Sequence, residues 1–149
     1  RFDKSILKTS PRLDACPEGS LTVNGYGNVD ALLGSINKSA TYSNEEVCRS
    51  QYTDAIEVYR NFAGNKAIED CQIAINNVVA QQSCPNGCKK DGFTIDRPCE
   101  VVSSNCQVYS KEISGSYYPF CYVFCGASST AEITIICSPL DEGATPNIE

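Results

Sequence analysis

The sequence of 149 residues contains no histidine. Histidine has the side-chain pKa closest to neutral pH and is the residue most often used as a general acid or base. Its absence excludes Ser–His–Asp and Cys–His catalysis, zinc hydrolase sites that use histidine ligands, and histidine-based ribonuclease chemistry. We therefore expect a protein that is not an enzyme, without catalytic residues, a cofactor or a metal site.

Basic charge and long apolar runs are also scarce. The chain has 12 lysine and arginine residues against 18 acidic residues, which gives a net charge of −6. Nucleic-acid binding requires a basic surface, and anionic membranes attract basic segments. No apolar run approaches the ~18 residues needed to span a bilayer. We therefore expect neither a nucleic-acid partner nor membrane insertion.

Acidic residues could still form a glycosidase-like pair of carboxylates, which requires a separation of ~5–10 Å across a cleft. The candidates are Glu45 with Glu46, Asp54 with Glu57, Glu69 with Asp70, and the single Glu100. The paired acids fall in a helical stretch, where such residues normally form the solvated face. We interpret all of them as surface residues, so an unrecognised hydrolase is the least favoured function.

Cysteine, by contrast, is abundant. The ten cysteines are Cys16, Cys48, Cys71, Cys84, Cys88, Cys99, Cys106, Cys121, Cys125 and Cys137. An even number in a chain of this size indicates disulfides formed in an oxidising compartment. The four-residue spacings Cys84–Cys88 and Cys121–Cys125 could bind zinc, but that would leave six further cysteines. We expect five disulfides in a secreted, extracellular protein, and we interpret Arg1 as the start of a mature form whose leader has been removed.

Two helices are predicted in the middle of the chain. Ser43 and Glu46 have the spacing of a capping box, and an apolar stripe of helical period follows from Cys48 to Ala63. Gly64 stands where a helix C-terminal glycine belongs, and a second stripe runs over about 66–82. So short a link predicts an antiparallel helical hairpin. Upstream, Leu21–Val23 is a strand candidate, and Asn28 could cap a helical turn over 28–33.

Short runs typical of β-strands follow Cys88, separated by clusters of glycine, proline, serine and asparagine. They cover 93–95, 99–102, 106–109, 117–125 and 131–137. Alternating apolar and polar residues in the last two runs indicate an antiparallel sheet with one covered face. Pro119 must lie near a strand start or on an edge. We expect an α+β fold, a helical hairpin packed on a small antiparallel sheet and held by five disulfides.

The predicted elements restrict the cysteine pairing without fixing it. A helical hairpin would place Cys48 beside Cys84 or Cys88, whereas Cys71 needs a partner elsewhere. Cys121 and Cys125 on one extended strand would be more than ~10 Å apart and should not pair with each other.

We expect a single domain over 1–149, with an N-terminal arm at about 1–12 and an acidic C-terminal tail at about 139–149. Three loops are candidates for recognition: the loop at Asn37, the loop from Cys84 to Gly92, and the loop from Ser110 to Ser116. Asn37-Lys38-Ser39 is also a sequon whose glycosylation would mark a surface loop. The run Tyr117-Tyr118-Pro119-Phe120 could stack on sugars, but we expect a sheet face buried under the helices.

The cysteine framework from Cys16 to Cys137, together with Tyr59-Arg60-Asn61-Phe62 on the first helix, resembles the LARS fold group of fungal effectors (Leptosphaeria avirulence-suppressing) and the related extracellular proteins of Cladosporium. In that group an aromatic residue, usually tryptophan, precedes the arginine, and Tyr59 stands there in this chain. The resemblance implies a protein of the host apoplast that host resistance proteins detect, without enzymatic activity. It implies a structural role for Arg60, which would tie the helix to neighbouring backbone.

The expected function is therefore that of a secreted, non-enzymatic effector of avirulence type from a plant-pathogenic fungus. Its expected partner is a host plant protein, such as a cell-surface immune receptor, and we expect a monomer. Two alternatives remain open. One is an extracellular protease inhibitor that presents the loop Cys84-Pro85-Asn86-Gly87-Cys88, because preorganisation of a loop reduces the cost of binding. The other is a carbohydrate-binding module that uses the tyrosines.

Overall fold

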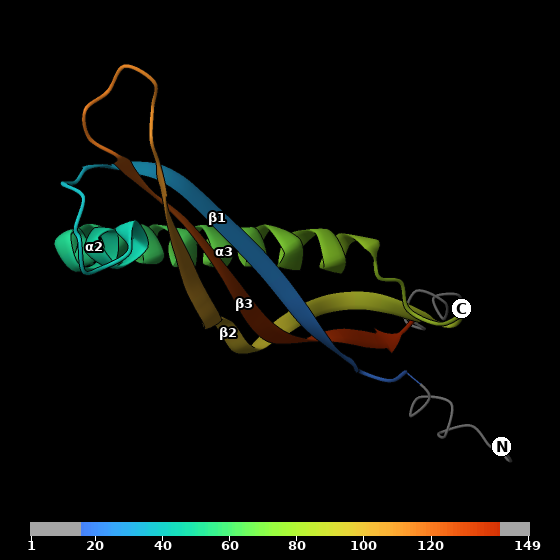
Figure 1. Ribbon diagram of the computed structural model, residues 1–149. Coiled ribbons are helices and arrows are strands. Elements are labelled where there is room, and N and C mark those ends of the chain that lie inside the picture. Colours follow the sequence, from blue (N-terminus) through green and yellow to red (C-terminus); the bar gives the residue numbers. More distant parts are fainter. Residues whose placement is uncertain (1–15, 141–149) are drawn as a thin grey trace, which may run out of the picture. The chain divides into compact units, whose positions relative to one another are not determined.

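A computed structural model describes residues 16–140 of the chain. Its elements in order are β1 (Gly19–Ser35), α2 (Asn44–Gln51), α3 (Thr53–Gln81), β2 (Cys88–Lys111) and β3 (Phe120–Pro139). The strands form one antiparallel sheet in the order β1-β3-β2 (Figure 1). The predicted α+β class, with its antiparallel sheet and five disulfides, is confirmed. The predicted arm at 1–12 and all of the tail beyond Leu140 lie outside the described residues.

The chain divides into two compact units, and each strand and α3 contribute residues to both. The larger unit consists of Asn24–Ala74 and Cys99–Thr130. Of the described residues, the smaller consists of 16–23, 75–98 and 131–140. Each disulfide lies within one unit. The larger unit contains Cys48–Cys121, Cys71–Cys99 and Cys106–Cys125, and the smaller contains Cys16–Cys88 and Cys84–Cys137.

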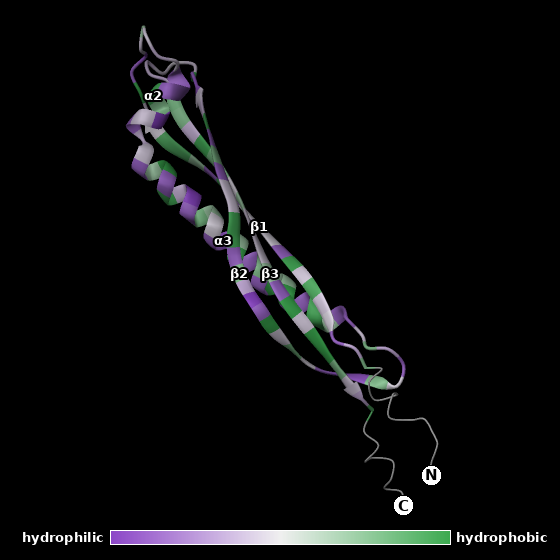
Figure 2. Ribbon diagram, turned by 90° about the horizontal axis from the view of Figure 1, so that it is seen from below, coloured by the Kyte–Doolittle hydropathy of each residue, from purple (hydrophilic) through white to green (hydrophobic). Residues whose placement is uncertain are grey.

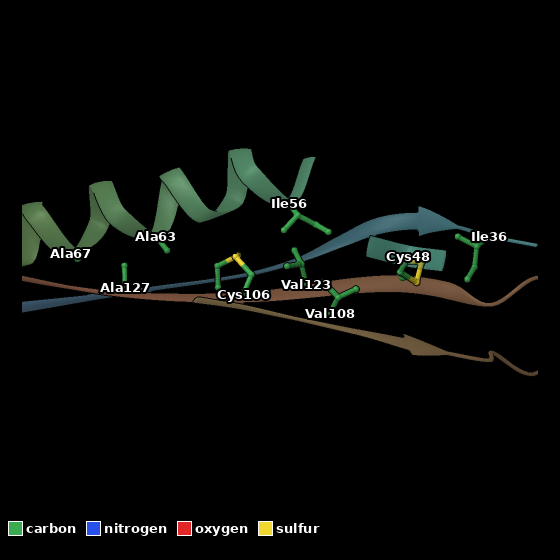
Figure 3. Packing of buried hydrophobic residues seen from close by; sticks show 11 residues of the cluster. Ile36, Cys48, Ile56, Ala63, Ala67, Cys106, Val108, Val123 and Ala127 are labelled. Carbon is green, nitrogen blue, oxygen red and sulfur yellow. A yellow bond between two sulfur atoms is a disulfide. The ribbon is translucent and has the colours of Figure 1, made fainter. Parts of the chain in front are cut away.

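The core of the larger unit forms between α3 and one face of the sheet. Alternate residues of β3, from Cys121 to Ala127, are buried together with Ile56, Ala63 and Ala67 of α3. In Figure 3 the side chains of α3 point toward these residues of the sheet. Figure 2 shows the matching alternation of hydrophobic and hydrophilic residues along the strands. The period of two found in the sequence of β3 is therefore a true division between a covered and an uncovered face.

Helix α3 packs unusually close to β1 because the contact is made by small residues. A Cβ atom placed on Gly25 would lie 2.7 Å from the Cα of Cys71, and one on Gly27 would lie 2.7 Å from the Cβ of Lys66. Real Cβ atoms essentially never approach so closely, so both positions require glycine. The backbones of α3 and β1 are thus in direct contact. On β3, the buried Ser129 hydroxyl also donates a hydrogen bond of 2.6 Å to the carbonyl of Ala67.

In the smaller unit, the buried hydrophobic residues are Val23, Ile75, Ala131, Ile133 and Ile135. The end of α3 is capped by Lys90, whose ammonium group donates to the carbonyls of Val79 and Gln82. This contact satisfies carbonyl groups that have no partner within the helix, and it places a positive charge at the negative end of the helix dipole.

The helical signals were partly correct. The capping box of Ser43 and Glu46 is confirmed, and α2 begins at Asn44. The turn predicted at Gly64 is wrong, because α3 continues through Gly64 to Gln81. Gly64 is buried, and an added Cβ would lie 3.2 Å from Cγ2 of Val101. This glycine therefore accommodates β2 rather than ending a helix. The helices are separated at Tyr52, whose hydroxyl donates to the carbonyl of Ser35.

The cysteine pairing follows from this correction. The pairing of Cys48 with Cys84 or Cys88 is wrong, because a helix that does not reverse at Gly64 cannot return to Cys48. Cys48 instead pairs with Cys121. The expectation that Cys71 needs another partner is confirmed by its bond to Cys99, and Cys121 and Cys125 do not pair with each other.

The strands are longer than the sequence indicated. The strand candidate at Leu21–Val23 is confirmed as part of β1, which precedes the helices. The helical turn predicted over 28–33 is wrong, because these residues belong to β1. The short runs after Cys88 join into two strands, because the polar residues between them lie within the sheet. Ser103 and Ser128, for example, are hydrogen-bonded to each other with 2.6 Å between their hydroxyl oxygens. Pro119 directly precedes β3, as expected.

Candidate interaction surface

Two of the predicted recognition loops lie side by side in the larger unit. One covers 36–43, between β1 and α2, and the other covers 112–119, between β2 and β3. The backbone N–H of Ile36 donates to the carbonyl of Pro119 at 3.0 Å, and Lys38 forms an ion pair of 2.8 Å with Glu112. Figure 1 shows both loops at the same end of the strands. We call these residues the paired loops.

The base of the paired loops is rigid. Pro119 is fully buried and Ile36 is buried in the core, so each loop is anchored by an apolar residue. The disulfide Cys48–Cys121 joins α2, which follows one loop, to the start of β3, which follows the other. The ion pair of Lys38 and Glu112 is exposed and contributes little stability by itself. The covalent bond and the buried anchors therefore hold the loops in place.

Each loop also has internal hydrogen bonds that limit its flexibility. The Ser39 hydroxyl accepts hydrogen bonds of 3.0 Å from the backbone N–H groups of Thr41 and Tyr42. In the second loop, the backbone N–H of Ser116 donates to the carbonyl of Ile113 at 2.9 Å. Gly115 within this turn has a φ of 84°, a conformation that glycine adopts without strain. Both loops are thus built from turn chemistry that fixes their backbone.

The paired loops expose aromatic side chains. Tyr117 is 92% exposed and Tyr118 is 50% exposed, and their ring centroids are 5.5 Å apart. The expectation that this run forms a buried sheet face is wrong, because β3 begins only at Phe120 and the tyrosines precede it. Tyr42 in the first loop is 61% exposed and borders an open groove of about 540 Å³ with Glu46, Val47, Ser50 and Gln51.

The remaining predicted residues have structural roles or stand at the surface. Asn37 is exposed in the first loop, where the sequon placed it. Arg60 donates from Nη1 to the carbonyl of Ser104 at 3.2 Å and pairs through Nε with Glu57 at 3.0 Å. Tyr59 packs against the core and forms an edge contact with Phe62.

The acidic candidates are likewise accounted for by structural contacts or by exposure. Glu46 accepts the capping-box hydrogen bond from the backbone N–H of Ser43, and Asp70 accepts one from the backbone N–H of Tyr26. Glu57 pairs with Arg60, whereas Glu45, Asp54, Glu69 and Glu100 are exposed.

The third predicted loop, from Cys84 to Gly92, lies in the smaller unit and is only partly a loop. Its first part is a tight turn, whereas β2 already begins at Cys88. Its two cysteines bond to different partners, Cys84 to Cys137 and Cys88 to Cys16. The backbone N–H of Cys88 donates to the carbonyl of Pro85 at 3.0 Å, and Gly87 has a φ of 88°. A protease binds its substrates and many inhibitors as extended backbone, which a turn closed in this way does not present. The geometry therefore does not favour the protease-inhibitor alternative.

A cluster that the sequence did not single out lies in the larger unit on the sheet face opposite α3. Tyr109 and Tyr122 stack with ring centroids 5.4 Å apart and an interplanar angle of 13°. The ammonium group of Lys111 lies 5.3 Å from the centroid of Tyr122. The hydroxyl of Tyr109 donates to Asp30 at 3.3 Å. Desolvation, followed by the carboxylate of Asp30, raises the pKa of Tyr109 above 10.0. Predicting this cluster would require knowing which residues of the neighbouring strands are opposite each other. The alternation of apolar and polar residues along one strand does not give that information.

Within residues 16–140, no group of three or more cysteine, aspartate or glutamate residues is arranged to hold a metal ion. In the same part of the chain, no helix has the length and apolar character needed to cross a membrane. No protein-family profile, curated protein or solved structure matches the chain. The functional argument therefore rests on the residues of this molecule.

Proposed function

We propose that this protein is a secreted, non-enzymatic effector of a plant-pathogenic fungus, which acts in the host apoplast and contacts a host protein through the paired loops. The observation that carries the proposal is the exposure of Tyr117 and Tyr118 on a base held by the Cys48–Cys121 disulfide. Five disulfides fit an extracellular protein. The apoplastic location and the avirulence-type role come from the LARS resemblance.

The chemistry of the second loop suits protein recognition. Tyrosine is enriched at the energetically dominant positions of interfaces because it offers a large, fairly rigid and amphipathic surface. Here Ser114-Gly115-Ser116 directly precedes two tyrosines, a composition also typical of antibody binding loops. The buried anchors and the disulfide reduce the conformational entropy lost on binding. The hydrogen bond from Arg60 to the carbonyl of Ser104 supports the proposal, since the resemblance implies a contact between this helix and neighbouring backbone.

The proposal is tested by expressing the full chain in leaves of candidate host plants and scoring cell death or its suppression. We expect Tyr117→Ala and Tyr118→Ala to abolish the response while the protein still accumulates and keeps its disulfides. Both side chains are exposed, so their removal should change stability by less than about 0.5 kcal/mol. Phe62→Ala, which removes a half-exposed aromatic ring of α3, is the matched control and should respond like the parent protein. A response that survives both tyrosine substitutions would refute the proposal.

A further inference from the structure

The sheet face of the larger unit that lies opposite α3 carries a second set of exposed side chains, which we call the outer face. Its central strand is β3, flanked by β1 and β2. Three contacts between β2 and β3 share one register: the Ser103–Ser128 hydrogen bond, the Cys106–Cys125 disulfide and the stacked rings of Tyr109 and Tyr122. In an antiparallel pair, residues between these contacts are also opposite each other. Asn105 is therefore opposite Gly126, and Gln107 is opposite Phe124.

The other flank of β3 completes the outer face. A Cβ placed on Gly126 would lie 3.0 Å from Oδ1 of Asn28, so Asn28 of β1 is beside this glycine. The exposed residues Asn28 and Asn105 thus flank a position on β3 that has no side chain. Phe124, which is 40% exposed, lies on β3 two residues before Gly126. Two amides and an aromatic ring therefore gather around a position without a side chain of its own, which the amide oxygen of Asn28 approaches.

The aromatic part of the outer face is already ordered. Tyr109 is fixed by its stacking on Tyr122 and by its hydrogen bond to Asp30. Lys111 lies over both rings, with its ammonium group 6.0 Å from the centroid of Tyr109. A ligand on this surface would therefore not have to immobilise these side chains, which reduces the cost of binding.

The side chains of the outer face match one ligand chemistry. An amide offers both a donor and an acceptor, as a sugar hydroxyl does, and an aromatic ring can stack on the apolar face of a pyranose. The charged groups are one acid and one base, and both are engaged: Asp30 with Tyr109, and Lys111 with the tyrosine rings. The outer face therefore has no excess of positive charge that would favour an anionic ligand such as a phosphate or a uronate.

A second copy of the chain is a less suitable occupant. It would bury Asn28, Asn105 and Gln107, and each amide left without a partner would cost free energy. We propose that the outer face binds an uncharged oligosaccharide, with a pyranose ring on Phe124 and hydroxyl groups on the amides of Asn28, Asn105 and Gln107. This site is separate from the paired loops and does not depend on the proposed function.

The experiment titrates the full chain with cellohexaose, laminarihexaose, xylohexaose and chitohexaose, with oligogalacturonate as the charged probe, by calorimetry. We expect at least one uncharged probe to bind, and Asn105→Ala and Phe124→Ala to weaken that binding about tenfold or more. Both residues are exposed. Circular dichroism of each variant checks that it folds. Tyr117→Ala is the matched control and should bind the sugar like the parent protein.

Three results would overturn the inference. The first is that none of the uncharged probes binds at millimolar concentration. The second is that both variants bind as tightly as the parent, because the sugar would then occupy another site. The third is that the protein dimerises in analytical ultracentrifugation and Asn105→Ala abolishes the dimer, because the outer face would then join two copies. Since host recognition is scored with the tyrosine variants of the loop, failure of one proposal is distinguishable from failure of the other.

Discussion

At the scale of single residues, the environment of each side chain decides its role more than its type does. Tyr109 and Tyr117 are both tyrosines near the ends of strands. Tyr109 is held by Asp30 and Tyr122, whereas Tyr117 is almost fully exposed on its loop. The first can therefore order a surface, and the second is free to contact a partner. Their sequence neighbours do not reveal this difference.

The environment of Tyr109, which includes the contact with Asp30, makes its contribution to the free energy of unfolding depend on pH in a defined direction. Its pKa in the folded protein lies above 10.0, so the folded state keeps a proton that the unfolded state loses. This contribution to the free energy of unfolding is fully present below about pH 10 and is lost as pH rises through the raised pKa.

We predict that Tyr109 ionises at a higher pH than a free tyrosine side chain when tyrosinate absorbance is followed against pH. Tyr109→Phe should remove this late step. Asp30→Asn should move it to lower pH, because the substitution removes the negative charge that disfavours tyrosinate. A midpoint that Asp30→Asn leaves unchanged would contradict the assigned hydrogen bond.

At the scale of elements, α3 packs directly on the backbone of β1. Gly25→Ala would push a methyl group against the backbone of Ala67 and Cys71, which cannot rotate away. We predict that the free energy of unfolding falls by about 3 kcal/mol, at the upper end of the range for overpacked sites. Denaturant unfolding with the disulfides intact measures the loss. Gly19→Ala is the matched control, since nothing lies within 4 Å of its added Cβ, and equal stability of the two variants would contradict the close packing.

The elements also show how far local sequence signals reach. The capping box at Ser43, the alternation in β3 and the position of Pro119 could all be predicted, because each depends on neighbours in the chain. The helix end predicted at Gly64 is wrong because a glycine that ends a helix and a glycine that admits a neighbouring strand look alike in sequence. The difference lies in Val101, a residue distant in the chain.

The candidate site was predictable to the same extent. Loops at Asn37 and after Ser110 were expected from their turn-forming residues, and both are at the surface. Their contact through Lys38 and Glu112 depends on the pairing of β1 and β2 with β3, which single-sequence patterns do not specify. The alternation of residues typical of a strand continues through Tyr117 and Tyr118, and it therefore predicts a buried sheet face for them. That prediction is wrong because the strand begins only after Pro119.

At the scale of the whole molecule, the disulfides provide covalent support for both units. Three of the disulfides lie in the larger unit and two in the smaller. Each one closes a loop of the chain and so removes conformational freedom from the unfolded state. A disulfide of this kind typically contributes ~2–4 kcal/mol. Such a frame suits a protein that must persist among extracellular proteases while its surfaces contact other molecules.

The central claim, that five specific disulfides hold these surfaces in place, is tested most directly by mapping the cysteine linkages of the native protein after non-reducing digestion. We predict five linked peptide pairs: Cys16–Cys88, Cys48–Cys121, Cys71–Cys99, Cys84–Cys137 and Cys106–Cys125. Free thiols at these positions, or a bond from Cys48 to any residue other than Cys121, would contradict the claim, because the paired loops would then lack the base described above.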